Sequence, residues 1–234
     1  MVHHERVTDL SAVNSKEIVR TGYDRVSGTY RGDRFDLTDP EQMKYAGWIE
    51  ELKIQLGPGG DVLDLGCGNG VPVAQLLVQA GYGYVGVDLS PVQIERARRL
   101  TPHAEFICGD MSELQVPAER FSAVASLYAM IHLPLEEQRG LLKRIHQWLQ
   151  PGGVLMIIVG ATEWTGVEED WLGVPGVTMY WSHADLPTYQ KWLVDCEFEM
   201  MRSRFVPEGE GGHVLVMARK AQTTHGQRAC EGAW

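Results

Sequence analysis

The chain has 234 residues, 44% of them hydrophobic, and this composition supports a buried core and excludes a disordered chain. Its 21 basic and 31 acidic residues give a formal net charge of −10, which disfavours nucleic acid and anionic membrane surfaces as partners. The N-terminus lacks an apolar signal region, and the apolar runs are shorter than the about 18 residues of a membrane span, so we expect a cytoplasmic protein. The four cysteines do not have the spacing of metal ligands, so we expect no metal.

Two helices are predicted before the first strand. Residues 1–15 carry no clear pattern, and "SKEIVRTGYDRVSGTYRG" reads as the first helix. The second runs from about Glu41 to Leu56, where Tyr45, Trp48 and Leu52 fall on one face, and "GPGG" ends it. We expect residues 1–56 to form an N-terminal helical cap.

Strands and helices then alternate. The predicted strands are "DVLDLG", "YVGVDL", "AEFICGD", "FSAVASLY" and "VLMIIVG". Helices lie between them, and one starts with Ser90 as N-cap, Pro91 at its first position and Gln93 at the capping-box position. This alternation predicts an α/β fold with a parallel sheet covered on both faces. We place this core at residues 57–220.

The alternation of predicted strands and helices ends after Gly160. Residues 161–181 hold three tryptophans among glycine, proline and acidic residues, and we expect them to form an insertion that acts as a lid. A helix in "HADLPTYQKWLVDCE" and an antiparallel hairpin from "FEMMRSRFVP" and "HVLVMARK" follow. Residues 221–234 are predicted to be a disordered tail.

The stretch "VLDLGCGNG" places a glycine loop after the first core strand, where open α/β sheets bind ligands. Its spacing is G-x-G-x-G, and Val71 stands where a dinucleotide site would have its third glycine. Asp64 precedes the loop, and a carboxylate there suits a cationic ammonium group better than a pyrophosphate. A nicotinamide-dependent oxidoreductase is therefore disfavoured.

Two further acidic residues end the next strands. Asp88 is placed to accept hydrogen bonds from both ribose hydroxyls. Asp110 can accept from an adenine amine, and Met111 can pack on the ring. The predicted ligand has an adenine, a ribose and a positively charged end without phosphates.

These motifs, together with "FSAVASLYAMIHLP" and "LQPGGVLMIIV", resemble in order and spacing those of class I S-adenosylmethionine-dependent methyltransferases. The resemblance covers roughly residues 20–160. It implies a Rossmann-like, mostly parallel seven-stranded sheet with a C-terminal antiparallel hairpin, and S-adenosyl-L-methionine as cofactor with S-adenosyl-L-homocysteine as product.

The resemblance also implies roles for individual residues. The methionyl part would be held by Gly66, Cys67 and Gly68, and the amino end by the backbone near Leu127. Tyr23 and Tyr30 would approach the cofactor's carboxylate or the substrate. The complete set of expected cofactor-binding residues is Tyr23, Tyr30, Asp64, Gly66, Cys67, Gly68, Asp88, Leu89, Gln93, Asp110, Met111 and Leu127.

Methyl transfer needs alignment of donor and acceptor, and a general base is optional. His132 in "YAMIHLP" is a candidate base, with capping of the next helix as the alternative. His183 is a second candidate base, or else a pocket wall. Aromatic residues after the core are candidates for acceptor binding, although core packing explains each of them as well: Trp164, Trp171, Tyr180 and Trp181.

The sequence lacks the N-P-P-Y or D-P-P-Y tetrapeptide of nucleic-acid and protein amino methyltransferases, which points to a small-molecule acceptor. We therefore predict methyl transfer to an O, N or S atom of a small molecule, for example a secondary metabolite, by a monomer or homodimer. The alternative is a cofactor-binding protein of the same fold that catalyses a non-methylating reaction or serves as a partner subunit.

Overall fold

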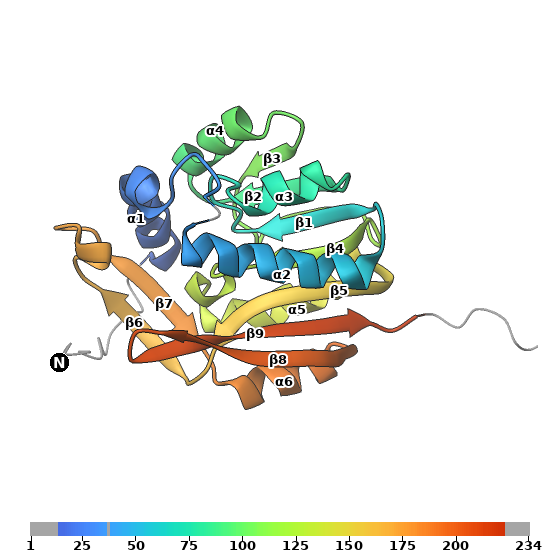
Figure 1. The fold of residues 1–234 in the computed structure, drawn as a ribbon. Coiled ribbons are helices and arrows are strands. Elements are labelled where there is room, and N and C mark those ends of the chain that lie inside the picture. The colour runs from blue at the N-terminus through green and yellow to red at the C-terminus, as the bar shows by residue number, and fades with distance from the viewer. Residues whose placement is uncertain (1–13, 37, 223–234) are drawn as a thin grey trace, which may run out of the picture.

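A seven-stranded sheet in the order β3-β2-β1-β4-β5-β9-β8 forms the centre of the computed structural model, which describes residues 14–36 and 38–222 (Figure 1). Strands β1 to β5 run parallel, and β9 pairs antiparallel with both β5 and β8. The expected fold class and the C-terminal hairpin are thus confirmed. The strands are β1 (Asp61–Leu65), β2 (Gly83–Asp88), β3 (Glu105–Cys108), β4 (Phe121–Ser126), β5 (Leu149–Gly160), β8 (Phe198–Glu208) and β9 (Gly211–Lys220).

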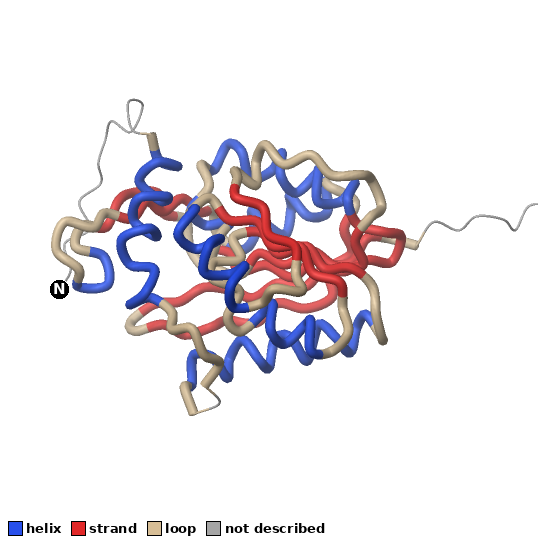
Figure 2. The backbone as a smooth tube through the Cα atoms, turned by 90° about the horizontal axis from the view of Figure 1, so that it is seen from above, coloured by secondary structure: helices blue, strands red, loops and turns tan. Residues whose placement is uncertain are grey.

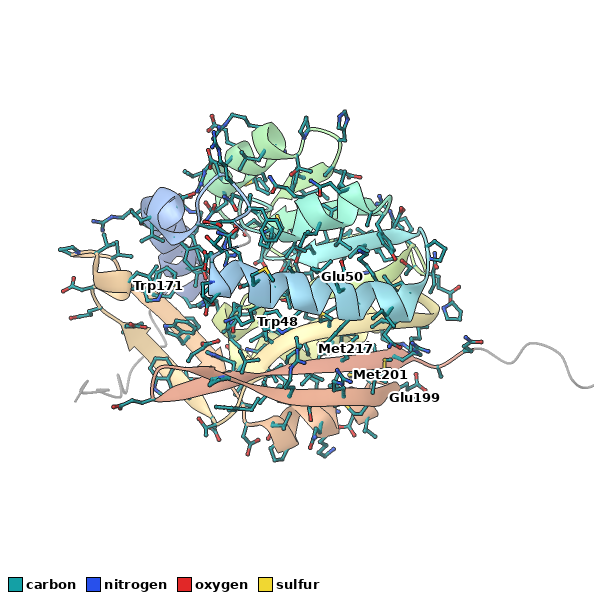
Figure 3. All side chains as sticks on the ribbon, viewed as in Figure 1. Trp48, Glu50, Trp171, Glu199, Met201 and Met217 are labelled. Carbon is teal, nitrogen blue, oxygen red and sulfur yellow. The ribbon has the colours of Figure 1, made fainter. Side chains whose placement is uncertain are left out.

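Helices cover both faces of this sheet (Figure 2). On one face lie α2 (Pro40–Leu56), α3 (Val73–Gln79) and α4 (Pro91–Leu100), and on the other α5 (Leu135–Trp148) and α6 (Leu186–Asp195). Trp48 of α2 and Met217 of β9 belong to the first core layer (Figure 3). Burial on both sides is why the central strands β1, β4 and β5 are apolar at most positions, whereas the edge strand β8 is largely exposed.

The two helices expected to form the cap lie in different places. Helix α2 packs on the sheet, whereas α1 (Ser15–Tyr30) lies beside a separate two-stranded sheet of β6 (Trp164–Glu168) and β7 (Met179–His183) (Figure 1). A small apolar cluster of Val26, Trp171, Val177 and Met179 joins them. The segment expected as a lid is thus mostly a hairpin packed on α1.

Within the described ranges, no helix is long and apolar enough to cross a membrane. The tail predicted to be disordered lies outside the described residues, apart from residues 221 and 222. Residues 1–13 at the N-terminus also lie outside the described residues.

The start of helix α4 has the predicted N-cap but not the predicted capping box. Ser90 is the N-cap, and its hydroxyl accepts a hydrogen bond from the Gln93 backbone N–H at 3.1 Å. The Gln93 side chain does not close the capping box. It accepts a hydrogen bond from the Ser27 hydroxyl at 2.9 Å and so ties α4 to α1.

Candidate functional site

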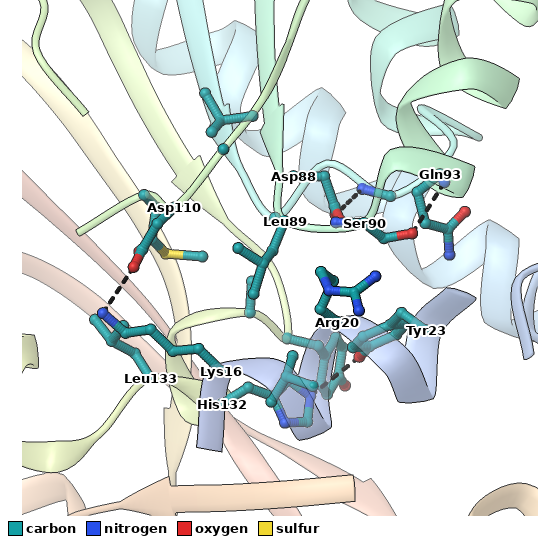
Figure 4. A pocket seen from close by; sticks show the side chains of 18 of the residues that line it. Lys16, Arg20, Tyr23, Asp88, Leu89, Ser90, Gln93, Asp110, His132 and Leu133 are labelled. Atoms are coloured by element: carbon teal, nitrogen blue, oxygen red, sulfur yellow. Dashed lines mark hydrogen bonds and ion pairs between the residues drawn. The ribbon is translucent and has the colours of Figure 1, made fainter. Parts of the chain in front are cut away.

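A cleft opens where the carboxyl ends of the first four strands meet beneath α1 (Figure 4). The space among its lining residues, open side included, is about 730 Å³. Most of the expected cofactor-binding residues and one candidate base come together here: Tyr23, Tyr30, Gly66, Gly68, Asp88, Leu89, Gln93, Asp110, Met111, Leu127 and His132.

The glycine loop is held against the neighbouring strand. The N–H groups of Gly66 and Cys67 both donate to the Val87 carbonyl, at 2.7 and 3.0 Å. Gly66 has φ +79°, and a Cβ at this position would overlap the Ala129 side chain. Glycine is therefore required here, because it alone permits both the positive φ and the close approach of the 127–129 segment.

The Asp88 side chain holds the glycine loop in place. Its carboxylate accepts hydrogen bonds from the backbone N–H groups of Gly68 at 2.8 Å and Ser90 at 2.9 Å, one on each oxygen. Burial raises the pKa of Asp88 to about 6. Each oxygen keeps acceptor capacity toward the cleft, which suits a pair of hydroxyl donors.

Asp64 and Cys67 lie behind the loop rather than in the main cleft. They line a smaller adjoining hollow together with Arg31, Tyr45 and other residues. Asp64 is 3% exposed and accepts a hydrogen bond from the Tyr84 hydroxyl at 2.6 Å, and burial raises its pKa to about 7. Burial also raises the pKa of the Cys67 thiol, so this cysteine is not an activated nucleophile.

Asp110 has a partner that the sequence did not predict. The Lys16 ammonium lies 2.7 Å from one carboxylate oxygen of Asp110 and 2.6 Å from Glu137, and the Ser112 N–H donates to the other Asp110 oxygen at 2.7 Å (Figure 4). Burial raises the pKa of Asp110, but the hydrogen bonds from Lys16 and Ser112 outweigh it and lower the pKa. Lys16 thereby fastens the start of α1 across the cleft.

His132 is buried between two hydrogen-bond partners. Its Nδ1 lies 2.7 Å from the Tyr180 carbonyl, which can only accept, so Nδ1 carries the proton. Its Nε2 therefore accepts the hydroxyl of Tyr23 at 3.0 Å (Figure 4). Burial lowers the pKa of His132 to about 4, which keeps the ring neutral. Neither nitrogen caps α5, which contradicts the alternative that this histidine caps the following helix.

A wider aromatic hollow continues from the cleft. The Trp171 ring lies 5.2 Å from Tyr23, and the Trp181 ring lies 4.4 Å from His132, measured between centroids. Both tryptophans line this hollow. Such walls suit a ligand that carries an aromatic ring.

The other acceptor candidates do not line the cleft or this hollow. Tyr180 contributes its backbone carbonyl to His132 rather than its ring. His183 donates through Nδ1 to the Thr162 carbonyl, 2.7 Å away, and its ring lies 6.2 Å from that of Trp164. Burial lowers the pKa of His183. The geometry therefore favours His132 over His183 beside the ligand.

Tyr128 also lines both spaces and was not predicted. It follows β4 with φ +61°, a strained value for a tyrosine, which is a mark of functional positions. Its hydroxyl donates to Glu208, whose other oxygen lies 2.9 Å from Nδ1 of His213. Only its place directly after a core strand could have signalled it. Among the described residues, no group of three His, Cys, Asp or Glu is placed to hold a metal ion.

A family model described as a methyltransferase domain matches residues 62–153. Sterol 24-C-methyltransferase from Yarrowia lipolytica is 29% identical over 146 residues, which make up 60% of this chain and 36% of that protein. The chain thus spans little more than a third of the length of this relative.

Two solved structures show the same fold over nearly the whole chain. The 1,6-didemethyltoxoflavin-N1-methyltransferase of Burkholderia thailandensis, with bound S-adenosylhomocysteine, has a TM-score of 0.67 and 22% identity, and covers 94% of each chain. The cyclase SpnF has a TM-score of 0.68 and 18% identity, and covers 89% of this chain and 96% of its own. At these identities the likeness concerns the fold.

Proposed function

We propose that this chain, whose residues 62–153 match a methyltransferase domain, is a class I S-adenosylmethionine-dependent methyltransferase that transfers a methyl group to an O, N or S atom of a small molecule. One observation carries this proposal. The glycine loop, Asp88 and Asp110 converge on one cleft, and that cleft opens directly into an aromatic hollow. A donor site and an acceptor site are therefore adjacent, as in-line transfer requires.

The residues present fit the cofactor. The cradle at Gly66 has no room for a side chain, Asp88 offers two acceptor oxygens, and Asp64 supplies a negative charge near the loop. When bound, S-adenosylmethionine supplies a methyl group on a sulfonium, which is already a good leaving group. We assign Asp88 to the ribose hydroxyls, Asp110 and Met111 to the adenine, and Asp64 to the amino group.

We assign His132 and Tyr23 to the acceptor side. The neutral His132 holds the Tyr23 hydroxyl by accepting its proton in a hydrogen bond. The Tyr23 oxygen keeps a lone pair for the acceptor's N–H or O–H, so the pair can orient the acceptor and take up its proton. Trp171 and Trp181 would pack on the acceptor ring.

The acidic net charge supports a small-molecule acceptor rather than nucleic acid or an anionic membrane surface, and we propose the cytoplasm as its location. A non-methylating reaction on the same fold is the second candidate, and a cyclase with the same fold shows that this fold is not confined to methyl transfer. A monomer or homodimer would serve either activity.

Labelling separates these candidates. The purified chain is incubated with methyl-labelled S-adenosylmethionine and a small-metabolite extract, and the label is separated by mass. Label in a low-mass product is the expected result. Label in macromolecules alone would contradict the small-molecule acceptor. Binding of S-adenosylhomocysteine without any labelled product would favour the non-methylating alternative.

A further inference from the structure

The aromatic hollow has a second polar point, which the function proposed above does not use. The turn of the β8–β9 hairpin brings Glu208 to the wall of the hollow, and Tyr128 lies on the same wall. The Tyr128 hydroxyl donates a hydrogen bond to one carboxylate oxygen of Glu208, and Nδ1 of His213 lies 2.9 Å from the other. These side chains come from the segment after β4 and from both strands of the hairpin, so only the folded chain brings them together.

The charge of Glu208 determines where the proton of each hydrogen bond lies. Burial raises the pKa of Glu208, but hydrogen bonds from His213 and Tyr128 outweigh it and lower the pKa, so the carboxylate is ionised and can only accept. Burial raises the pKa of the Tyr128 phenol, which therefore keeps its proton. That single proton is donated to Glu208. The Tyr128 oxygen consequently offers the hollow a lone pair and no proton.

The Tyr23 hydroxyl has the same arrangement at the first polar point (Figure 4). Its proton is donated to Nε2 of His132, 3.0 Å away, because Nδ1 of that ring donates to the Tyr180 carbonyl. Each of the two tyrosines, Tyr23 and Tyr128, thus gives its only proton to a base, and each oxygen is left as an acceptor. A ligand that contacts both oxygens must therefore supply a proton at both places.

Lys44 is a cation beside the second polar point, and its bonds leave the acceptors there available. Its ammonium lies 2.6 Å from Glu41, donates to the Tyr128 oxygen at 3.3 Å and lies 4.0 Å from Glu208. A phenol oxygen has a pair of acceptor positions, and a carboxylate has about four. After the bonds from Lys44, Tyr128 and His213 are counted, the Tyr128 oxygen and the Glu208 carboxylate each keep acceptor capacity toward a ligand.

A continuous row of rings joins the two polar points. The centroids of neighbouring rings lie 5.6 Å apart for Tyr23 and His132, 4.4 Å for His132 and Trp181, 6.1 Å for Trp181 and His213, and 5.5 Å for His213 and Tyr128. Tyr23, His132, Trp181 and Tyr128 line the hollow. The wall therefore suits a flat aromatic ligand that carries a polar group at either end.

We propose that Tyr128 and Glu208 bind a hydroxyl or amino group of the acceptor, and that the acceptor is an aromatic compound with two hydrogen-bond donors. One donor belongs to the atom that is methylated, which lies at Tyr23. The other donor lies at Tyr128 and Glu208 and fixes the direction in which the ring lies. The proposal rests on the function proposed above and deepens it by naming the substrate class.

Calorimetry with matched ligands tests the proposal, with the chain saturated with S-adenosylhomocysteine. The first ligand pair is hydroquinone and 4-methoxyphenol, and the second is 2,6-dihydroxynaphthalene and 6-methoxy-2-naphthol, so that one-ring and two-ring ligands are both covered. In each pair the methyl ether keeps one donor and loses the other. The diol of at least one pair should bind about tenfold more tightly than its ether, because the ether leaves Tyr128 and Glu208 without a donor.

Variants show whether the preference for the diol comes from the second polar point. Glu208→Leu removes the carboxylate and frees the Tyr128 proton for the ether oxygen, so the preference should be lost. Glu208→Gln keeps an acceptor oxygen and should retain part of the preference, and Tyr128→Phe should reduce it. Glu210→Leu, at an exposed position in the same turn, is the matched control and should leave the preference unchanged. Thermal unfolding checks that each variant is folded.

Three results would overturn the proposal while S-adenosylhomocysteine still binds: equal affinities within both ligand pairs, no binding of either diol, or a preference that survives in folded Glu208→Leu and Tyr128→Phe. A wild-type chain that fails to bind S-adenosylhomocysteine at all would instead overturn the proposed function, and the second polar point with it. The two failures are therefore distinguishable in the same titrations.

Discussion

The Asp88 carboxylate has two roles in the site. It orders the glycine loop through the Gly68 N–H and offers acceptors to the cleft. Asp88→Ala removes both, and we expect at least about tenfold weaker S-adenosylhomocysteine binding by calorimetry, since hydrogen bonds to a charged group contribute about 1.5–3 kcal/mol each. Asp195→Ala, at an exposed helix end, is the control. Unchanged affinity in Asp88→Ala would refute the assignment to the ribose.

The raised pKa values of Asp64, about 7, and Asp88, about 6, predict a pH dependence of binding. A bound ammonium and bound hydroxyl donors stabilise the ionised carboxylates, so the ligand lowers both pKa values and binding releases protons. The affinity for S-adenosylhomocysteine should therefore rise from about pH 5 to about pH 8.

Calorimetry in two buffers of different ionisation enthalpy measures the released protons directly. The stability of the free chain changes with pH in the opposite direction. The folded-state pKa values lie above the ordinary carboxyl value of 3.8, so ionisation of Asp64 and Asp88 destabilises the free folded chain as the pH rises from about 4 to 7. In Asp64→Asn, the rise in affinity for S-adenosylhomocysteine around pH 7 should disappear, because this rise comes from the ionisation of Asp64. An affinity that falls with rising pH would contradict this account.

At the scale of elements, the glycine loop and the 127–129 segment form one surface. Gly66→Ala would force a methyl group into Ala129, whereas a Cβ at Gly68 meets no atom within 4 Å. Both positions have positive φ, so each substitution costs about 1–2 kcal/mol of backbone strain, and only Gly66→Ala adds a clash. We expect Gly66→Ala to abolish S-adenosylhomocysteine binding and Gly68→Ala to weaken it modestly. Equal effects would show that the close approach is unimportant.

Local patterns in the sequence were enough to predict the elements whose apolar residues repeat with the period of a strand or of a helix. Strand β1 and the glycine loop follow each other in the chain, so the ligand end of the sheet was predictable from "VLDLGCGNG". Ser90 was predictable as an N-cap because the capping hydrogen bond joins two residues that are only three positions apart in the chain. The Gln93 side chain was predicted wrongly, since its partner Ser27 lies 66 residues away and carries no local mark.

Long-range partners explain the rest of what the sequence missed. Lys16 reaches Asp110, and the Tyr180 carbonyl fixes His132, through packing of α1 and β7 that no periodicity encodes. His183 and Trp181 are two residues apart in β7, yet only Trp181 lines the aromatic hollow. Composition of the 161–181 segment therefore indicated an aromatic wall but not which of its residues face the ligand.

The whole molecule has cores of very unequal size. Two large apolar clusters fill the faces of the main sheet, whereas, among the described residues, the cluster that joins α1 to the β6–β7 hairpin has four buried apolar residues and five partly buried ones. Small buried area means a low free energy of local opening. We expect backbone amides of α1 and β7 to exchange hydrogen faster than those of β1, β4 and β5 in the free chain, measured by mass spectrometry.

Saturation with S-adenosylhomocysteine should then slow exchange in α1, because this helix closes the cleft through Lys16 and contributes Tyr23 and Tyr30 to it. A ligand that binds the closed arrangement stabilises it by mass action, and a concentration of about 100 times Kd contributes about 2.7 kcal/mol. Asp88→Ala at the same ligand concentration is the control and should show much less slowing. If the ligand slows exchange in the glycine loop and leaves α1 unchanged, α1 is a fixed wall and entry to the cleft does not depend on its opening.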